Sequence, residues 1–154
     1  MKDLVDGKGW RVAMRQYQLD LYRAACRKNV IAYLDTGSGK TFISVLLIRD
    51  IAARAIKRNA KEGGNKKSIF FLVPRKVLVY QQAEVLKQFT DLVVSAHSGD
   101  RNNEDVWDKS MWQHYISKAD VMVMTPQILL NMLRKQYDKI LPPSHPTAQG
   151  PFLG

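Results

Sequence analysis

A run of small, polar and charged residues carries the chemistry needed to bind phosphate. It is Thr36-Gly37-Ser38-Gly39-Lys40-Thr41. The glycines let the backbone turn sharply, so that successive amide N–H groups face one concave surface. A helix that begins at Thr41 adds its positive N-terminal end to that surface. In this arrangement Lys40 reaches the β- and γ-phosphates of a nucleotide, and the Thr41 hydroxyl holds Mg²⁺. The run therefore predicts a nucleoside-triphosphate site.

One position departs from the general phosphate-loop pattern G-x-x-x-x-G-K-[ST], because Leu34 stands where that pattern has its first glycine. The alternative is a glycine-rich turn from strand to helix that holds no ligand. A strand pattern before the run and a helix pattern after it are the context that a phosphate loop requires. This context favours the nucleotide site.

Apolar strand patterns alternate with helical patterns from residue 15 to about residue 135. We expect strands at 30–34, 68–73, 92–97 and 120–124. We expect helices at 15–28, 41–58, 75–89 and 105–117 and another from 126 onward, with a polar loop at 59–67. Strands separated by helices predict parallel pairing and a three-layer α/β domain. We divide the chain into an N-terminal extension (1–10), the domain (11–136) and a disordered tail (137–154), since four prolines and no periodicity mark the segment from Pro142.

Composition narrows the class of protein. Lys and Arg number 24 against 14 Asp and Glu, a net charge of +10, which favours a polyanionic partner such as nucleic acid. Cys26 is the only cysteine, so an internal disulfide and a cysteine metal cluster are excluded. A lone cysteine favours an intracellular, reducing environment, compatible with either nucleus or cytoplasm. The absence of a signal-like or membrane-spanning apolar run predicts a soluble protein.

Two segments resemble a known ATP site. Leu34-Asp35-Thr36-Gly37-Ser38-Gly39-Lys40-Thr41 resembles motif I of the first RecA-like domain of superfamily-2 helicases, in the branch that contains Dicer and the RIG-like receptors; there the leading glycine is commonly replaced. Arg15-Gln16-Tyr17-Gln18 resembles the segment whose glutamine reads adenine. The resemblance implies a RecA-like fold, ATP and Mg²⁺ as ligands, and Gln18 as the adenine reader, with Arg15 and Tyr17 framing the base. The implied nucleotide-binding residues are Arg15, Gln18, Leu34, Asp35, Thr36, Gly37, Ser38, Gly39, Lys40 and Thr41.

Three later segments resemble the loops that contact the RNA backbone in that family. They begin at Val73 (motif Ia), His97 and Val123 (motif Ib), and the sequence around the first and last of these leans towards plant Dicer-like proteins. The resemblance implies an RNA partner, double-stranded in a Dicer-like parent, and a second RecA-like domain as partner if the chain is part of a longer protein. The implied RNA contacts are Pro74, Arg75, Gln81, Ser98, Gly99, Thr125, Pro126 and Gln127. Taken singly, each segment is also compatible with ordinary turn chemistry between a strand and a helix.

The Asp-Glu pair that follows motif Ib in the family has no counterpart in strand context here; Asp138 is followed by Lys139. That pair holds Mg²⁺ and orients the attacking water. We therefore expect a truncated domain, incomplete at its C-terminal side, which binds ATP and RNA but does not hydrolyse ATP alone. We also expect Val30–Leu34 to expose a strand edge and an apolar face.

Other functions remain as alternatives. The chain is also compatible with a non-catalytic nucleotide- or RNA-binding regulator, or with a helicase of another superfamily-2 branch. A GTPase or a small-molecule kinase is less compatible, because Asn65-Lys66-Lys67-Ser68 lacks the aspartate of the Asn-Lys-x-Asp motif that GTPases use to read guanine.

Overall fold

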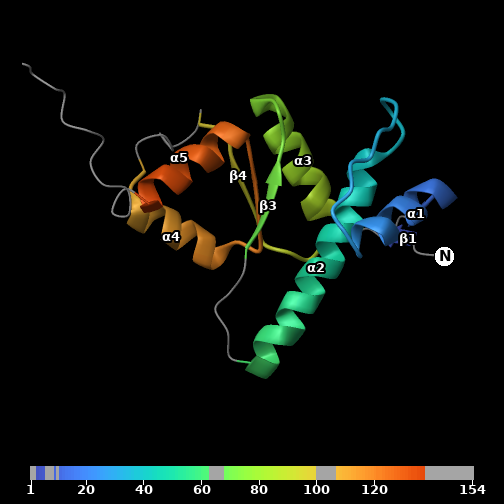
Figure 1. The fold of residues 1–154 in the computed structure, drawn as a ribbon, viewed down its shortest axis with the longest axis horizontal. Helices are drawn as coiled ribbons and strands as arrows, with labels where there is room; N and C mark the ends of the chain where they lie inside the picture. Colours follow the sequence, from blue (N-terminus) through green and yellow to red (C-terminus); the bar gives the residue numbers. More distant parts are fainter. Residues whose placement is uncertain (1–2, 6–8, 10, 63–67, 100–106, 138–154) are drawn as a thin grey trace, which may run out of the picture.

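The computed structural model describes residues 3–5, 9, 11–62, 68–99 and 107–137 (Figure 1). In chain order its elements are β1 (Asp3–Val5), β2 (Arg11–Ala13), α1 (Gln16–Ala25), α2 (Lys40–Glu62), β3 (Ile69–Leu72), α3 (Lys76–Phe89), β4 (Val94–His97), α4 (Lys109–Lys118), β5 (Val121–Met124) and α5 (Pro126–Tyr137). From β3 onward strands and helices alternate, as the apolar spacing predicts, whereas α1 and α2 follow each other with no strand between them.

A parallel sheet forms the centre of the domain. Its strand order is β3-β5-β4, and Val121 of β5 lies opposite Ile69 on one side and Val94 on the other. The helices α3 and α4 connect these strands, as parallel pairing requires. Because the strands are parallel, their carboxyl ends all lie at one edge of the sheet. The predicted parallel α/β architecture is confirmed.

The two faces of β5 belong to two separate hydrophobic clusters. Val121 and Val123 pack with residues of α1, α2 and α3, whereas Met122 and Met124 pack with residues of α4 and α5. All four side chains are fully buried. Successive side chains of a strand point to opposite faces, so this alternation makes β5 the middle of three layers. Figure 1 shows α2 and α3 on one side of the strands and α4 and α5 on the other.

Val30–Leu34 does not form the strand that its apolar run predicts. Among the described residues, this segment pairs with no strand. Ile31 and Tyr33 are 99% and 97% exposed, which confirms the expected apolar exposure. The physical reason is that an apolar run becomes a buried strand only where a neighbour accepts its backbone hydrogen bonds and another layer covers its side chains. In the described part of the chain no strand pairs with this segment, and of its side chains Leu34 alone packs against the core.

Two further features of the described chain differ from the expectation. Helix α2 continues to Glu62, so the predicted loop is wrong for residues 59–62, because Ala60, Lys61 and Glu62 are strong helix formers and glycine comes only at position 63. Residues 63–67 lie outside the described part. An antiparallel pairing of β1 with β2 was not predicted.

Tyr137 is the last residue of α5, and the remainder of the predicted tail, 138–154, lies outside the described residues. None of the described helices combines the length and the apolarity needed to cross a bilayer.

An aspartate side chain caps the start of α4. Asp108 is the N-cap residue: its carboxylate accepts hydrogen bonds from the Met111 backbone N–H at 2.9 Å and from the Ser110 hydroxyl at 2.8 Å. These two bonds, the Met111 bond first, lower the pKa of Asp108 below its usual value of 3.8. A lowered pKa means that the charged form stabilises the folded state above pH 3.8, and this contribution is lost as pH falls through the folded pKa.

We therefore expect Asp108→Asn to weaken the pH dependence of stability in acid. The melting temperature of the wild type should fall more steeply between pH 5 and about pH 3 than that of Asp108→Asn, which keeps a capping oxygen without a charge. Asp91→Asn, at an exposed aspartate after α3, is the matched control and should follow the wild type. Parallel curves for wild type and Asp108→Asn would contradict the assignment.

Candidate nucleotide site

The glycine-rich loop has the backbone geometry that a phosphate loop requires. Gly37 and Gly39 have φ values of 82° and 80°, which only glycine adopts readily. The Ser38 amide and hydroxyl both donate to the Asp35 carbonyl, at 3.3 Å and 2.7 Å. Helix α2 begins at Lys40, immediately after the second glycine. The loop is therefore formed even though the segment before it is not a strand.

Lys40 folds back over the start of the loop. Its Nζ donates to the Leu34 carbonyl at 2.6 Å and to the Asp35 carbonyl at 3.3 Å. The side chain is exposed, and its ammonium group has three donors on a four-carbon stem. Thr41, the residue predicted to hold Mg²⁺, is half-buried in the first turn of α2.

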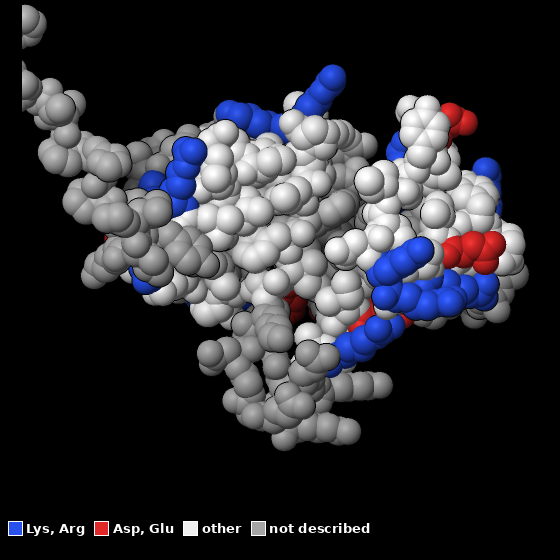
Figure 2. Space-filling model, in the orientation of Figure 1, with Lys and Arg blue, Asp and Glu red and all other residues white. Residues whose placement is uncertain are grey.

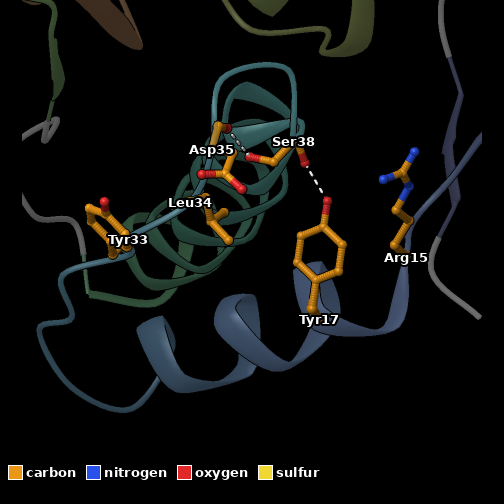
Figure 3. A pocket seen from close by; sticks show the side chains of 6 residues that line it. All are labelled: Arg15, Tyr17, Tyr33, Leu34, Asp35 and Ser38. Carbon is orange, nitrogen blue, oxygen red and sulfur yellow. Dashed lines mark hydrogen bonds between the residues drawn. The ribbon is translucent and has the colours of Figure 1, made fainter.

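A pocket of about 370 Å³ lies between α1 and the loop. Its lining residues are Arg15, Tyr17, Tyr33, Leu34, Asp35 and Ser38 (Figure 3). Volumes of this order accommodate small ligands. The pocket joins the predicted base-binding segment to the predicted phosphate-binding segment. Tyr33 is a lining residue that the sequence reasoning did not name, since an apolar run around it predicted a strand interior.

Gln18 connects the two segments directly. It is 5% exposed, and its Nε2 donates to the carbonyls of Ser38 at 3.1 Å and Gly39 at 3.3 Å. Its Oε1 accepts the backbone N–H of Arg15 at 2.8 Å. The predicted adenine reader is therefore placed against the loop, and its amide already makes contacts within the protein.

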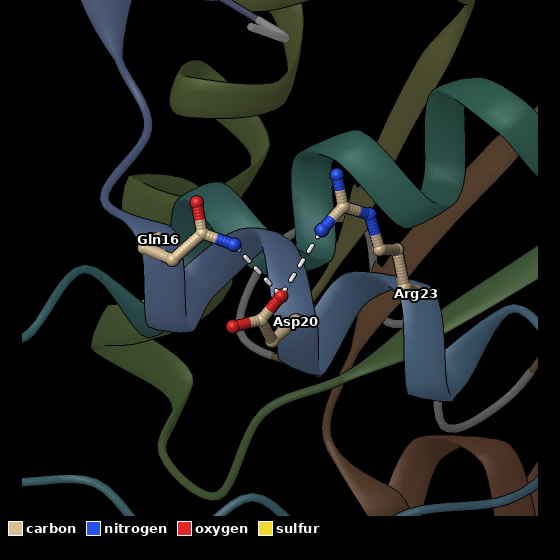
Figure 4. A network of polar contacts seen from close by, with 3 residues as sticks. All are labelled: Gln16, Asp20 and Arg23. Atoms are coloured by element: carbon tan, nitrogen blue, oxygen red, sulfur yellow. Dashed lines mark hydrogen bonds and ion pairs between the residues drawn. The ribbon is translucent and has the colours of Figure 1, made fainter.

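Gln16, the other glutamine of this segment, lies on the outer face of α1. Its Nε2 donates to Asp20 at 2.9 Å, and Arg23 approaches the same Asp20 oxygen at 3.1 Å (Figure 4). All three residues are exposed. Gln18, and not Gln16, is therefore the glutamine of this segment whose hydrogen bonds reach the loop.

The predicted RNA contacts come from loops at the carboxyl edge of the sheet. The Val73 N–H donates to the Met124 carbonyl at 3.0 Å, which joins the segments after β3 and β5. The Tyr80 and Ser98 hydroxyls lie 2.8 Å apart and join α3 to the segment after β4. The structure therefore brings the three segments together.

The predicted RNA contacts differ in exposure. Five of them are exposed: Pro74, Arg75, Gln81, Pro126 and Gln127. Ser98 and Thr125 are buried, with 0% and 8% of their surfaces accessible, and Gly99 is half-buried with φ 85°. The Ser98 side chain thus faces Tyr80 rather than solvent.

The distribution of charge on one face agrees with a basic edge. Figure 2 shows Lys and Arg side chains along the upper edge near α3 and α5 and a second group over α1 and α2. The middle of this face is largely uncharged. Among the described residues, no cluster of His, Cys, Asp and Glu could hold a metal ion, so Thr41 stays the predicted metal contact.

Comparison with known sequences places these features in a family. Residues 15–142 match the family described as DEAD/DEAH box helicase. The chain is 43% identical over 126 residues to Endoribonuclease Dicer homolog 2b of Oryza sativa subsp. japonica, covering 82% of this chain and 9% of the relative. It is 44% identical over 120 residues to Endoribonuclease Dicer homolog 1 of Arabidopsis thaliana, covering 78% of this chain and 6% of the relative. The chain therefore spans less than a tenth of the length of these relatives.

Solved structures agree on the fold. The Hef helicase domain of Pyrococcus furiosus superposes with a TM-score of 0.53 at 26% identity, covering 78% of this chain and 22% of that chain. The Type ISP restriction-modification enzyme LlaGI, solved with a DNA substrate mimic, has a TM-score of 0.55, covering 85% of this chain and 14% of that chain. Its 19% identity supports the fold alone. The predicted RecA-like fold is confirmed.

The contact between Gln18 and the loop predicts the effect of a methyl group at Gly39. A Cβ added there would lie 2.4 Å from Gln18 Nε2, in a backbone conformation that strains any L-residue. At Gly37 the φ is nearly the same, but an added Cβ would meet nothing within 4 Å. We expect both Gly→Ala variants to lose roughly 1–2 kcal/mol through backbone strain. Gly39→Ala should lose more, because it also displaces Gln18.

Urea unfolding of the two variants measures the difference. The double variant Gly39→Ala/Gln18→Ala has no clash, because the Gln18 side chain is gone. Its loss of unfolding free energy should therefore equal the backbone strain at Gly39 plus the loss measured for Gln18→Ala alone. Equal losses for Gly37→Ala and Gly39→Ala would show that Gln18 does not press on the loop.

Proposed function

Since the chain belongs to the DEAD/DEAH box helicase family, we propose that it binds ATP–Mg²⁺ at the loop before α2 and an RNA backbone at the carboxyl edge of its sheet. The single observation that carries the nucleotide proposal is the junction of α1 with the loop, where Gln18 contacts two loop carbonyls beside an open pocket. That junction joins a base-binding segment to a phosphate-binding segment.

The phosphates bind within the loop. Backbone N–H groups of the loop and the first turn of α2 supply hydrogen bonds and the positive end of the helix dipole. Lys40 leaves the Leu34 and Asp35 carbonyls and carries its charge to the β- and γ-phosphates, while Thr41 contributes a hydroxyl to Mg²⁺. A ligand with both phosphate charge and a bound cation satisfies all of these groups at once.

The adenine base lies in the pocket beside α1. Gln18 Oε1 accepts one hydrogen bond within the protein and keeps a second lone pair for the adenine amino group. Arg15 and the ring of Tyr17 line the same pocket. A hydrogen-bond acceptor at this position matches the amino group of adenine and opposes the carbonyl of guanine.

The chain alone binds ATP without turning it over. Phosphoryl transfer depends on positioned charge and a positioned water, which the family's paired carboxylates supply. The sequence contains no Asp directly followed by Glu. This property makes a binding-only regulator the second candidate function; within a longer protein of the Dicer-like type, the same segment contributes the ATP-binding part of an RNA-directed motor.

RNA contacts the exposed residues beyond the strands. Arg75 and the N–H groups at the starts of α3 and α5 offer charge and hydrogen bonds to phosphates. The proposal is supported by the names of the relatives, which are endoribonucleases. Its contacts go to the sugar-phosphate backbone, so binding is independent of base sequence.

Replacement of Lys40 tests the nucleotide site. We expect Lys40→Ala to weaken ATP–Mg²⁺ binding by roughly 10- to 150-fold, since hydrogen bonds to charged groups contribute about 1.5–3 kcal/mol. Isothermal titration calorimetry measures the change, and competition with GTP tests the base. Lys109→Ala is the matched control, because Lys109 is also an exposed lysine at the first position of a helix.

Two results would contradict the proposal. Equal affinities of wild type and Lys40→Ala would remove the loop as the phosphate site. Steady phosphate release by the wild type that disappears in Lys40→Ala would contradict binding without turnover.

Replacement of Arg75 tests the RNA edge. We expect Arg75→Ala to reduce the slope of log affinity against log salt by about 0.7 to 0.9, the contribution of one phosphate contact. Fluorescence anisotropy with double-stranded RNAs of unrelated sequence measures both slope and sequence independence. Lys118→Ala removes an exposed charge next to the opposite end of β5 and should leave the slope unchanged. Equal slopes for Arg75→Ala and wild type would exclude this edge.

A further inference from the structure

The carbonyl of Ser38 receives two hydrogen bonds from α1. The Tyr17 hydroxyl donates to it at 2.6 Å (Figure 3). Gln18 Nε2 donates to it at 3.1 Å. Ser38 lies between the two glycines with positive φ, so the carbonyl belongs to the part of the loop with the greatest backbone freedom. The helix therefore restrains the loop at the position where the loop is least restrained by its own sequence.

Fixing this carbonyl fixes an amide group as well. The Ser38 carbonyl and the Gly39 N–H belong to one planar peptide unit, and the described chain has no cis peptide bond. In a trans peptide the C=O and the N–H point in opposite directions. With the carbonyl held towards α1, the Gly39 N–H is directed away from α1, to the other side of the loop.

We propose that Tyr17 is a positioning residue for phosphate: through the Ser38 carbonyl, its hydroxyl orients the Gly39 N–H as a phosphate donor. This inference rests on the proposed nucleotide site and assigns to Tyr17 a role different from framing the base. The ring lines the pocket, whereas the hydroxyl acts on the loop. The two roles are separable, because the hydroxyl can be removed while the ring stays.

The test compares three probes on the full chain: ATP, adenosine and inorganic tripolyphosphate, each titrated with Mg²⁺ present. Tyr17→Phe should weaken ATP and tripolyphosphate about two- to tenfold, the range that corresponds to one neutral hydrogen bond. Adenosine affinity should not change. Tyr17→Leu, which also removes the ring, should weaken tripolyphosphate to the same extent as Tyr17→Phe.

Tyr22→Phe is the matched control. It makes the same chemical change on the same helix and removes the hydrogen bond from the Tyr22 hydroxyl to Asp50 of α2, away from the loop. This variant should lose stability without a change in tripolyphosphate affinity. In the unliganded chain, the backbone amide resonance of Gly39 should shift in Tyr17→Phe and stay in place in Tyr22→Phe.

Each outcome has a distinct meaning. If wild type binds none of the probes, the proposed function fails, and this inference fails with it. If wild type binds and Tyr17→Phe matches it on tripolyphosphate, only the inference fails. If Tyr17→Phe weakens adenosine and ATP binding equally, the hydroxyl acts on the base instead. If Tyr22→Phe loses as much tripolyphosphate affinity as Tyr17→Phe, the effect comes from a less stable α1, and the inference fails.

Discussion

Protein surrounds β5 in every direction perpendicular to the strand. Strands β3 and β4 pair with its two edges, and two apolar clusters cover its two faces. A strand in this position cannot shift by one residue without moving Met122 and Met124 into the space of Val121 and Val123. The register of β5 therefore fixes the carboxyl edge of the sheet. The loops that carry Arg75, Ser98 and Gln127 inherit their common location from that constraint.

The glycine-rich loop before α2 is held in a different way. Its preceding segment is not part of the sheet, since Val30–Leu34 pairs with no strand among the described residues. The restraints come instead from α1, where Tyr17 and Gln18 donate to the loop carbonyls. Away from the loop, Tyr22 donates to Asp50 of α2. Leu19 and Tyr22 are buried in the cluster that includes Val121 and Val123. Helix α1 thus transmits the position of the sheet core to the loop.

The sequence predicts features that depend on residues close together in the chain. It does not predict contacts between residues far apart in the chain. The β5 pattern and the helix start at Pro126 depend on nearby residues and a buried position, and both were predicted correctly. Gln18 was identified by its neighbours in the sequence, but its contacts with Ser38 and Gly39 cross about twenty positions, for which single-sequence patterns carry no signal. The strand predicted at Val30–Leu34 was wrong for the same reason. A strand needs a partner strand, and the residues of this segment do not specify one.

The same distinction of range separates binding from catalysis. The proposed base and phosphate recognition uses residues between Arg15 and Thr41, which one helix, one loop and one helix start bring together. Hydrogen bonds within that stretch hold these elements against one another. Hydrolysis demands more, because carboxylates must be placed on the far side of the phosphates and a water must be aligned with the scissile bond. A chain can therefore keep a phosphate site through local structure while the geometry of hydrolysis depends on strands that its local sequence does not specify.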